Sequence, residues 1–200
     1  MNRDLKLLGR VCLVLVLAEV MLVILSWLLS ATMMEGVRSL LSSEGIRWFV
    51  GSYSAMMASP LLVWLLLLLS AYGCVQRSGV VSLFRRRAPI TYRERIALRV
   101  AVIFLCIYVV IIALLTLMPH AILLSATGDL FPSAFSRCLV PIVAFAVILF
   151  AVAFAMMAGH ISTLSALLQF VSYGIAKGAP LVVVLFLLIQ FFKSVRFVFG

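Results

Sequence analysis

Long apolar runs separated by short polar or basic segments dominate the sequence. The clearest run covers residues 60–74 and reads PLLVWLLLLLSAYGC. A helix needs about 20 apolar residues to cross the hydrocarbon core of a bilayer. The pattern therefore predicts an all-α integral membrane protein, a single membrane domain over residues 1–200, with short interfacial helices. We place its transmembrane helices at about 11–33, 54–75, 96–118, 138–158 and 181–199.

The last of these five spans is the shortest. Its largely apolar run covers residues 179–192, and Lys193 and Arg196 follow. If the segment crosses the bilayer, these long side chains can extend to the polar interface. An alternative topology has four spans and a re-entrant or interfacial tail, and both topologies stay open at this point.

Composition agrees with a lipid environment, because 66% of the residues are hydrophobic and only 11% are charged. That leaves too few polar residues to cover a soluble domain. We find no Gly-rich phosphate loop, no catalytic triad order and no pair of carboxylates, so we expect neither an enzyme nor a cofactor. We also expect no metal site, since the cysteines and histidines lack ligand spacing. These residues are Cys12, Cys74, Cys106, Cys138, His120 and His160.

The formal charge of +10 is concentrated in the N-terminal tail and in an Arg-rich loop over residues 76–95. Positive loops stay on the cytoplasmic side during insertion. This predicts a multi-pass protein of the cytoplasmic (inner) membrane with its N-terminus inside. Within the loop, Arg85, Arg86 and Arg87 indicate topology and contact with anionic lipid, worth about 1 kcal/mol each. Nucleic-acid binding would need a soluble module, and none is predicted.

One acidic residue, Glu19, lies deep inside a predicted span. A carboxylate in hydrocarbon is costly, so it should be protonated, or face a partner group, or face water. Two interpretations stay open: an intramembrane ionisable site for a proton or ion, and a hydrogen bond between helices. The second is favoured, although the helical neighbours of Glu19 offer little polar help. They are Cys12, Leu15, Leu22, Val23 and Ser26.

Small residues recur along the fourth span. Ala151, Ala155 and Gly159 fall four apart, which places them on one helix face. Such a small-xxx-small face lets two helix backbones approach closely. We therefore predict a packed helix pair here, within one chain or between copies. Pro141 in the same span predicts a kink.

Several residues mark expected helix ends. Ser43 can cap a short interfacial helix whose first turn holds Glu44. Thr91 and Glu94 form a capping box that begins the third long helix, and Pro119 ends it.

The segment after residue 159 carries Gly174, Gly178 and Pro180, which predict an interrupted chain. We place Pro180 in the first turn of the last helix. In transporters such broken stretches line substrate sites, and in other membrane proteins they are interfacial helices. The second interpretation is favoured.

Two regions resemble the AbgT family, the p-aminobenzoyl-glutamate transporters. The first reads SLLSSEGIRWFVGSY over residues 39–53 and continues to QRSGV at residues 76–80. The second covers residues 139–192, where AG, IS, AP and QF steps occur in the order typical of a late part of that family. Together they cover somewhat over half of the chain. The Glu-Gly-Ile-Arg-Trp run is the most specific match.

The resemblance implies a family of dimers that move folate catabolites or related anionic compounds. Its members are more than twice as long, and their hairpin transport core lies between the two matching regions, so no substrate- or ion-contacting residue is carried over. The chain is thus expected to be an AbgT-like oligomeric, accessory or scaffold subunit without that core. The alternative is a transporter of p-aminobenzoyl-glutamate or a related small anion that works as an oligomer. Expected partners are membrane lipids and either further copies or other membrane subunits.

Overall fold

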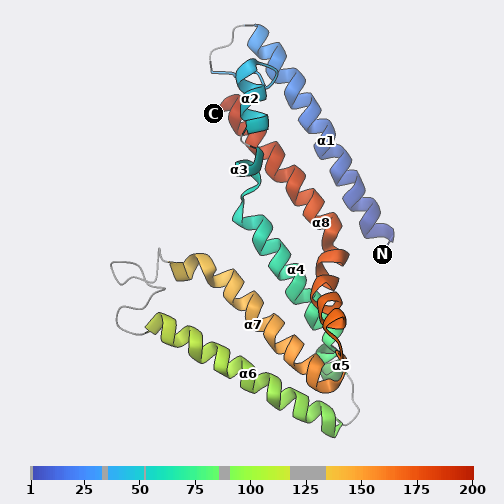
Figure 1. Cartoon of the computed structure of the whole chain (residues 1–200). Coiled ribbons are helices and arrows are strands. Elements are labelled where there is room, and N and C mark those ends of the chain that lie inside the picture. The colour runs from blue at the N-terminus through green and yellow to red at the C-terminus, as the bar shows by residue number, and fades with distance from the viewer. Residues whose placement is uncertain (1, 33–35, 52, 86–90, 118–133) are drawn as a thin grey trace. The chain divides into compact units, whose positions relative to one another are not determined.

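The computed structural model describes residues 2–32, 36–51, 53–85, 91–117 and 134–200. Within these ranges the regular structure is helical and contains no strand. The helices are α1 (Asn2–Ala31), α2 (Ser43–Gly51), α3 (Tyr53–Met57), α4 (Pro60–Ser78), α5 (Val80–Arg85), α6 (Tyr92–Leu117), α7 (Ala134–Ala158) and α8 (Leu164–Phe199) (Figure 1). Of these, α1, α4, α6, α7 and α8 are long and apolar enough to cross a membrane. The chain is an all-α multi-pass membrane protein, as predicted.

The second span begins at Pro60, and the prediction of a start near residue 54 was wrong. Proline fits the first helical position because the N–H that it lacks has no helical partner there. Ser59 caps the helix, since its Oγ accepts from the backbone N of Leu61 at 3.4 Å. Ser54 belongs instead to the short helix α3.

The short helix predicted to begin near Ser43 is present as α2, but its cap is one residue earlier than expected. The Oγ of Ser42, not that of Ser43, accepts from the backbone N of Gly45 at 3.0 Å. The capping box of α6 is confirmed: the backbone N of Thr91 donates to Oε2 of Glu94 at 2.9 Å. Pro119 lies outside the described residues.

The expected interruption of the last segment was wrong. Helix α8 runs continuously from Leu164 to Phe199, with Gly174, Gly178 and Pro180 inside it. A break would expose several backbone groups to hydrocarbon, where each unpaired group costs several kcal/mol. An internal proline removes one hydrogen bond, so continuing the helix is the smaller cost. Helix α7 likewise stays helical through Pro141.

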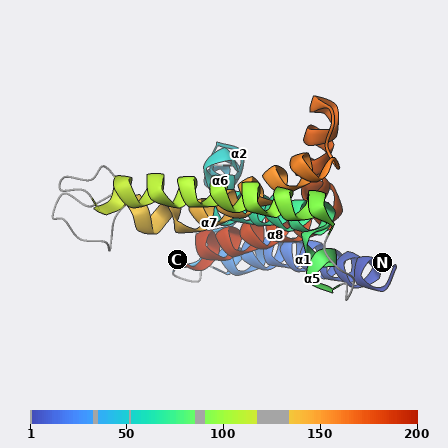
Figure 2. The same ribbon diagram turned by 90° about the horizontal axis from the view of Figure 1, so that it is seen from below.

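The chain divides into two compact units, which are described separately. Unit 1 contains Met1–Leu65 and Gly178–Gly200, and unit 2 contains Leu66–Lys177. In unit 1, α1 lies beside the second half of α8 (Figures 1 and 2). Ser194 bonds Glu19, and Val198 packs in one cluster with Leu22, so the two helices run parallel.

This parallel pairing bears on the last segment. Residues 178–199 follow α1 in the same direction, as a spanning helix does, whereas a re-entrant hairpin would turn back. The arrangement favours the five-span topology over the four-span alternative. Residues 37–40 and helix α2 pack against the end of this helix pair. The backbone N of Arg38 donates to the carbonyl of Val198 at 3.0 Å. The ring of Trp48 stacks on Phe197 with centroids 4.3 Å apart.

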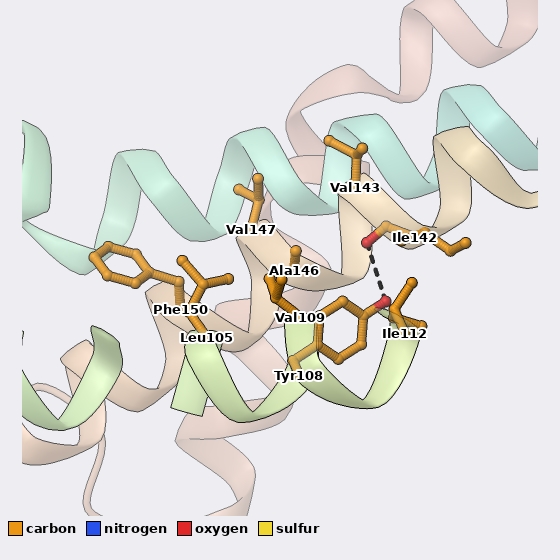
Figure 3. Close-up of a pocket in the computed structure, with 9 residues that line it drawn as sticks. All are labelled: Leu105, Tyr108, Val109, Ile112, Ile142, Val143, Ala146, Val147 and Phe150. Atoms are coloured by element: carbon orange, nitrogen blue, oxygen red, sulfur yellow. Dashed lines mark hydrogen bonds between the residues drawn. The ribbon is translucent and has the colours of Figure 1, made fainter. Parts of the chain in front are cut away.

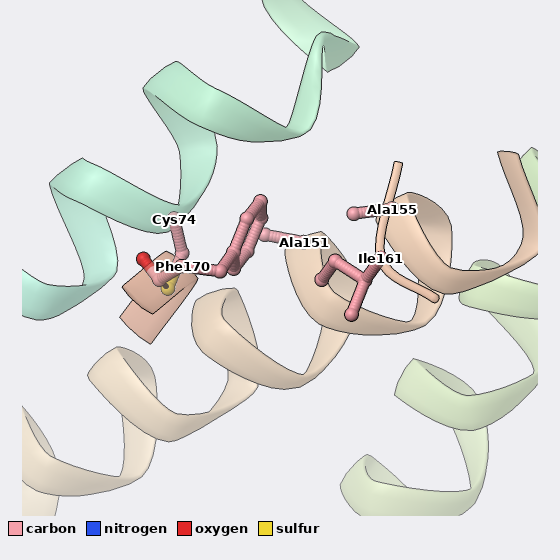
Figure 4. Close-up of a cluster of buried hydrophobic side chains, with 5 residues drawn as sticks. All are labelled: Cys74, Ala151, Ala155, Ile161 and Phe170. Atoms are coloured by element: carbon pink, nitrogen blue, oxygen red, sulfur yellow. Dashed lines mark hydrogen bonds between the residues drawn. The ribbon is translucent and has the colours of Figure 1, made fainter. Parts of the chain in front are cut away.

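Unit 2 is built around α7. Helix α6 runs antiparallel to it, because Ala101 shares a buried cluster with Phe154 whereas Tyr108 bonds Ile142. The second half of α4 and the first half of α8 contribute to another cluster on α7, in which Cys74 and Phe170 meet Ala151 (Figure 4). Both clusters rely on alanines, so the backbones lie close together.

Candidate functional site

The polar centre of unit 1 is Glu19 on α1. Its Oε1 accepts a hydrogen bond of 2.6 Å from the Oγ of Ser194, which is fully buried on α8. The residues expected beside Glu19 on its helix do form the inward face, and Leu22 and Ser26 are buried there. As expected, they do not help the carboxylate: Ser26 Oγ donates to the carbonyl of Val23 and accepts from the backbone N of Leu40. The partner comes from the other end of the chain.

Three polar side-chain atoms of this centre have no hydrogen-bond partner among the described residues. Oε2 of Glu19 and both amide atoms of Gln190 are buried without a hydrogen bond there. Gln190 lies one helical turn before Ser194 on the same face of α8. Oxygen atoms of a carboxylate, an amide and a hydroxyl are the groups that bind protons and hard cations. The arrangement can therefore bind a proton or small cation, or act as a polar helix contact.

A small cavity of about 190 Å³ adjoins Glu19. Apart from Glu19 its lining is apolar, and it lies between α1, the following loop and the amphipathic helix α2. The lining side chains are Val23, Leu40, Leu41, Ile46, Phe49 and Val50. Ile46, Phe49 and Val50 thus lie on one face of α2. It covers the Glu19 region from one side.

Glu19 stands out in the sequence as an acidic residue within a span, whereas Ser194 does not stand out. One signal was available: Gln190, Ser194 and Val198 repeat every four residues, and all three are buried on one face of α8. In an isolated span a serine carries little information, because its hydroxyl can also bond the carbonyl of its own helix. The link spans 175 residues of sequence, so only the tertiary structure reveals it.

Two of the three small residues that were predicted to share a helix face lie buried on α7. Ala151 and Ala155 are fully buried and pack with Phe170 and Ile161 (Figure 4). Gly159 has another role, because α7 ends at Ala158 and Gly159 is exposed, with a φ of 86°.

The hydrogen bonds around Gly159 are those of a helix C-cap. Its backbone N donates to the carbonyl of Met156, and the N of His160 donates to the carbonyl of Ala155. This is the Schellman arrangement, which favours glycine after the last helical residue. Gly159 therefore follows the end of α7 and is not part of the buried cluster that contains Ala151 and Ala155.

A close helix contact of unit 2 lies elsewhere, where α4 crosses α8. A Cβ atom built on Gly73 would overlap the backbone of Gly174, and one built on Gly174 would overlap the carbonyl oxygen of Leu69. Beside this contact the Oγ of Ser70 donates to the carbonyl of Val171 at 2.9 Å. Gly174 was predicted to interrupt the chain, but it lies inside α8 at this contact.

A groove of about 450 Å³ runs between α6 and α7 (Figure 3). Its lining is apolar apart from the hydroxyl of Tyr108, which donates to the carbonyl of Ile142 at 3.1 Å. The other lining residues are Leu105, Val109, Ile112, Val143, Ala146, Val147 and Phe150. The groove offers apolar contact and no chemistry.

The remaining predicted residues add no site. Arg85 ends α5, whereas Arg86, Arg87 and His120 lie outside the described residues. Among the residues that the structure describes, no three His, Cys, Asp or Glu side chains gather in a way that could hold a metal ion. The four cysteines are free thiols.

Comparison with known proteins gives no relative: no family model, no curated protein and no solved structure matches this chain.

Proposed function

We propose that the chain is a structural subunit of the cytoplasmic membrane, an AbgT-like helical scaffold or accessory protein without the family's transport core. Its N-terminus lies inside, and it acts in an assembly with further copies or with other membrane proteins. The proposal draws its family relationship from the resemblance of residues 39–53 and 139–192. It draws its mechanical role from the packing of unit 2.

The observation that carries the proposal is how unit 2 uses its polar side chains. Ser70 donates to the carbonyl of Val171 and Tyr108 to that of Ile142, each on another helix. These bonds join α4 to α8 and α6 to α7. Such bonds and small-residue contacts hold helices together in lipid, where the hydrophobic effect does not. The side chains therefore support helix association, and in these pairs they are not directed at a ligand.

Identifying the assembly tests this proposal. The tagged full chain is cross-linked in its native membrane, purified in mild detergent and analysed for mass and co-purifying proteins. A tagged membrane protein of similar size from the same cells is the control. We expect a specific stoichiometric assembly. A monomer that carries no partner beyond the control refutes the proposal.

Transport is a second candidate, and the buried polar groups of unit 1 favour it. Glu19, Gln190 and Ser194 lie along the contact of α1 and α8, and they are groups that can bind a proton or cation during coupled transport. The test is uptake of labelled p-aminobenzoyl-glutamate into proteoliposomes, compared with empty vesicles. We expect uptake to depend on Glu19, so Glu19→Gln must abolish it. Uptake equal to empty vesicles rejects this candidate.

A further inference from the structure

Two cations of unit 2 flank a single aromatic ring where α4 meets the first half of α8. The guanidinium of Arg77 lies 5.4 Å from the ring centroid of Tyr173, and the Nζ of Lys177 lies 6.0 Å from it. Arg77 also donates to the carbonyl of Gln169 at 3.2 Å, and Lys177 donates to Oε1 of Gln76 at 2.8 Å. These contacts hold the two long side chains beside the ring of Tyr173, although both side chains are exposed.

The partners of these cations are neutral. Among the described residues of unit 2 the only acidic side chain is Glu94, and its Oε2 accepts from the backbone N of Thr91. The ion pair that the structure shows between described residues joins Arg38 to Glu44 in unit 1. The positive charge of Arg77 and Lys177 is therefore not balanced by a nearby carboxylate in the described part of unit 2.

An amphipathic pocket of about 340 Å³ lies beside this charge, where α4 turns into α5. Val75 and Val81 line it with apolar surface, whereas Tyr72, Gln76 and Ser82 bring polar atoms. Gln76 belongs to the pocket and also accepts from Lys177, so the pocket and the cations adjoin. The pocket thus has an apolar wall next to a cationic edge.

The position along α4 matches the membrane boundary. The helix is apolar up to Val75 and becomes polar at Gln76, Arg77 and Ser78. A phospholipid at that depth presents a phosphate toward the polar side and the start of its acyl chains toward the apolar side. Basic residues between helices at this boundary are suited to anionic headgroups.

We propose that Arg77, Lys177 and Tyr173, with the pocket at the turn from α4 to α5, form a binding site for one anionic phospholipid. The two cations hold the phosphate, and Val75 and Val81 contact the glycerol and upper acyl region. This inference is independent of the function proposed above.

Native mass spectrometry of the purified full chain tests the site. The protein is delipidated and titrated with phosphatidylglycerol or with phosphatidylcholine of the same acyl chains, and the retained lipid is measured. We expect one phosphatidylglycerol to be retained selectively. Each basic residue near the surface contributes about 1 kcal/mol, which is about fivefold in affinity. The pair Arg77→Gln and Lys177→Gln should therefore weaken binding by roughly 25-fold.

A matched control removes the same charge elsewhere in unit 2, at Arg95 and Arg99 on α6. If Arg95→Gln with Arg99→Gln weakens binding as much as the first pair, the attraction is diffuse and the site is rejected. Equal retention of phosphatidylcholine also rejects it. Displacement of the lipid by inorganic phosphate at millimolar concentration identifies a phosphate site and overturns the lipid assignment.

A second variant leaves the charges in place and fills the pocket. Val81 is half exposed, so Val81→Trp is expected to be tolerated by the fold. It should reduce phosphatidylglycerol retention, and thermal unfolding of the purified variant checks that it is folded. If the double variant Arg77→Gln with Lys177→Gln does not fold, lipid retention by Val81→Trp alone tests the proposed site. Unchanged lipid retention in this variant contradicts the proposal.

Discussion

Replacing Gly174 by alanine tests the close contact between α4 and α8. The new Cβ atom would overlap the carbonyl oxygen of Leu69, which belongs to the backbone of α4 and cannot rotate away. The two helices must therefore separate. Added atoms in a packed interior cost about 1–3 kcal/mol. Separation also weakens the bond from Ser70 to Val171, and such bonds in membranes contribute about 0.6 kcal/mol on average.

The matched control is Gly9→Ala on α1, where a Cβ atom would meet nothing within 4 Å. Alanine in a helix interior is favoured over glycine by about 0.5–1 kcal/mol. The control should therefore leave the stability unchanged or raise it slightly. Because the same propensity gain applies to Gly174→Ala, the difference between the two variants isolates the cost of the steric overlap.

The measurement is the thermal unfolding midpoint of both variants in one detergent. For a chain of this size 1 kcal/mol corresponds to about 2–4 °C, so the midpoint of Gly174→Ala should lie about 2–12 °C below that of Gly9→Ala. Gly73→Ala should act in the same direction, since its Cβ would overlap the backbone of Gly174. Equal midpoints for Gly174→Ala and Gly9→Ala would refute the close crossing of α4 and α8.

Three further changes test individual contacts. Ser70→Ala removes the bond to the carbonyl of Val171 and should cost about 0.6 kcal/mol, at most about 1.7, in a chemical unfolding titration. Gly159 has a left-handed φ of 86°, so Gly159→Ala should lower the unfolding midpoint through backbone strain of about 1–2 kcal/mol. Light scattering of this variant should show an unchanged assembly mass. Ser194→Ala leaves the buried Oε1 of Glu19 without its hydrogen-bond donor. It should lower the free energy of unfolding by about 1–3 kcal/mol. Glu19→Gln keeps an acceptor for Ser194 and should lower the midpoint less than Ser194→Ala; the reverse order contradicts the assigned bond.

Helix positions followed from the sequence because lipid imposes a simple requirement. A spanning segment must be long, apolar and helical, so unbroken apolar runs mark it. Local chemistry then placed some ends correctly: the Glu94 side chain returns to the backbone of Thr91 at the start of α6. The start at Pro60 was missed because the residues before it are also apolar enough to extend a hydropathy window. Its proline and Ser59 are the better signals.

Helix pairing did not follow, since a lipid-facing surface is as apolar as a packed one. In a soluble helix the polar face shows which side is outward. Helix α1 lacks that contrast: its exposed side carries Leu13 and Trp27, and its buried side carries Leu22. The inward face is marked only by small or polar residues such as Ser26. The partner of each such residue lies far along the chain, as Ser194 does for Glu19.

The role of a glycine is also hard to predict from this sequence, because glycine ends one helix here and packs inside another. Gly159 ends α7 in a left-handed conformation, whereas Gly174 stays helical and admits the backbone of α4. Both lie among small and apolar neighbours, so composition does not separate them. What separates them is the bonding of the next residues: after Gly159 the backbone returns to carbonyls of Ala155 and Met156. Around Gly174 the helix continues, since lipid offers its backbone no other partner.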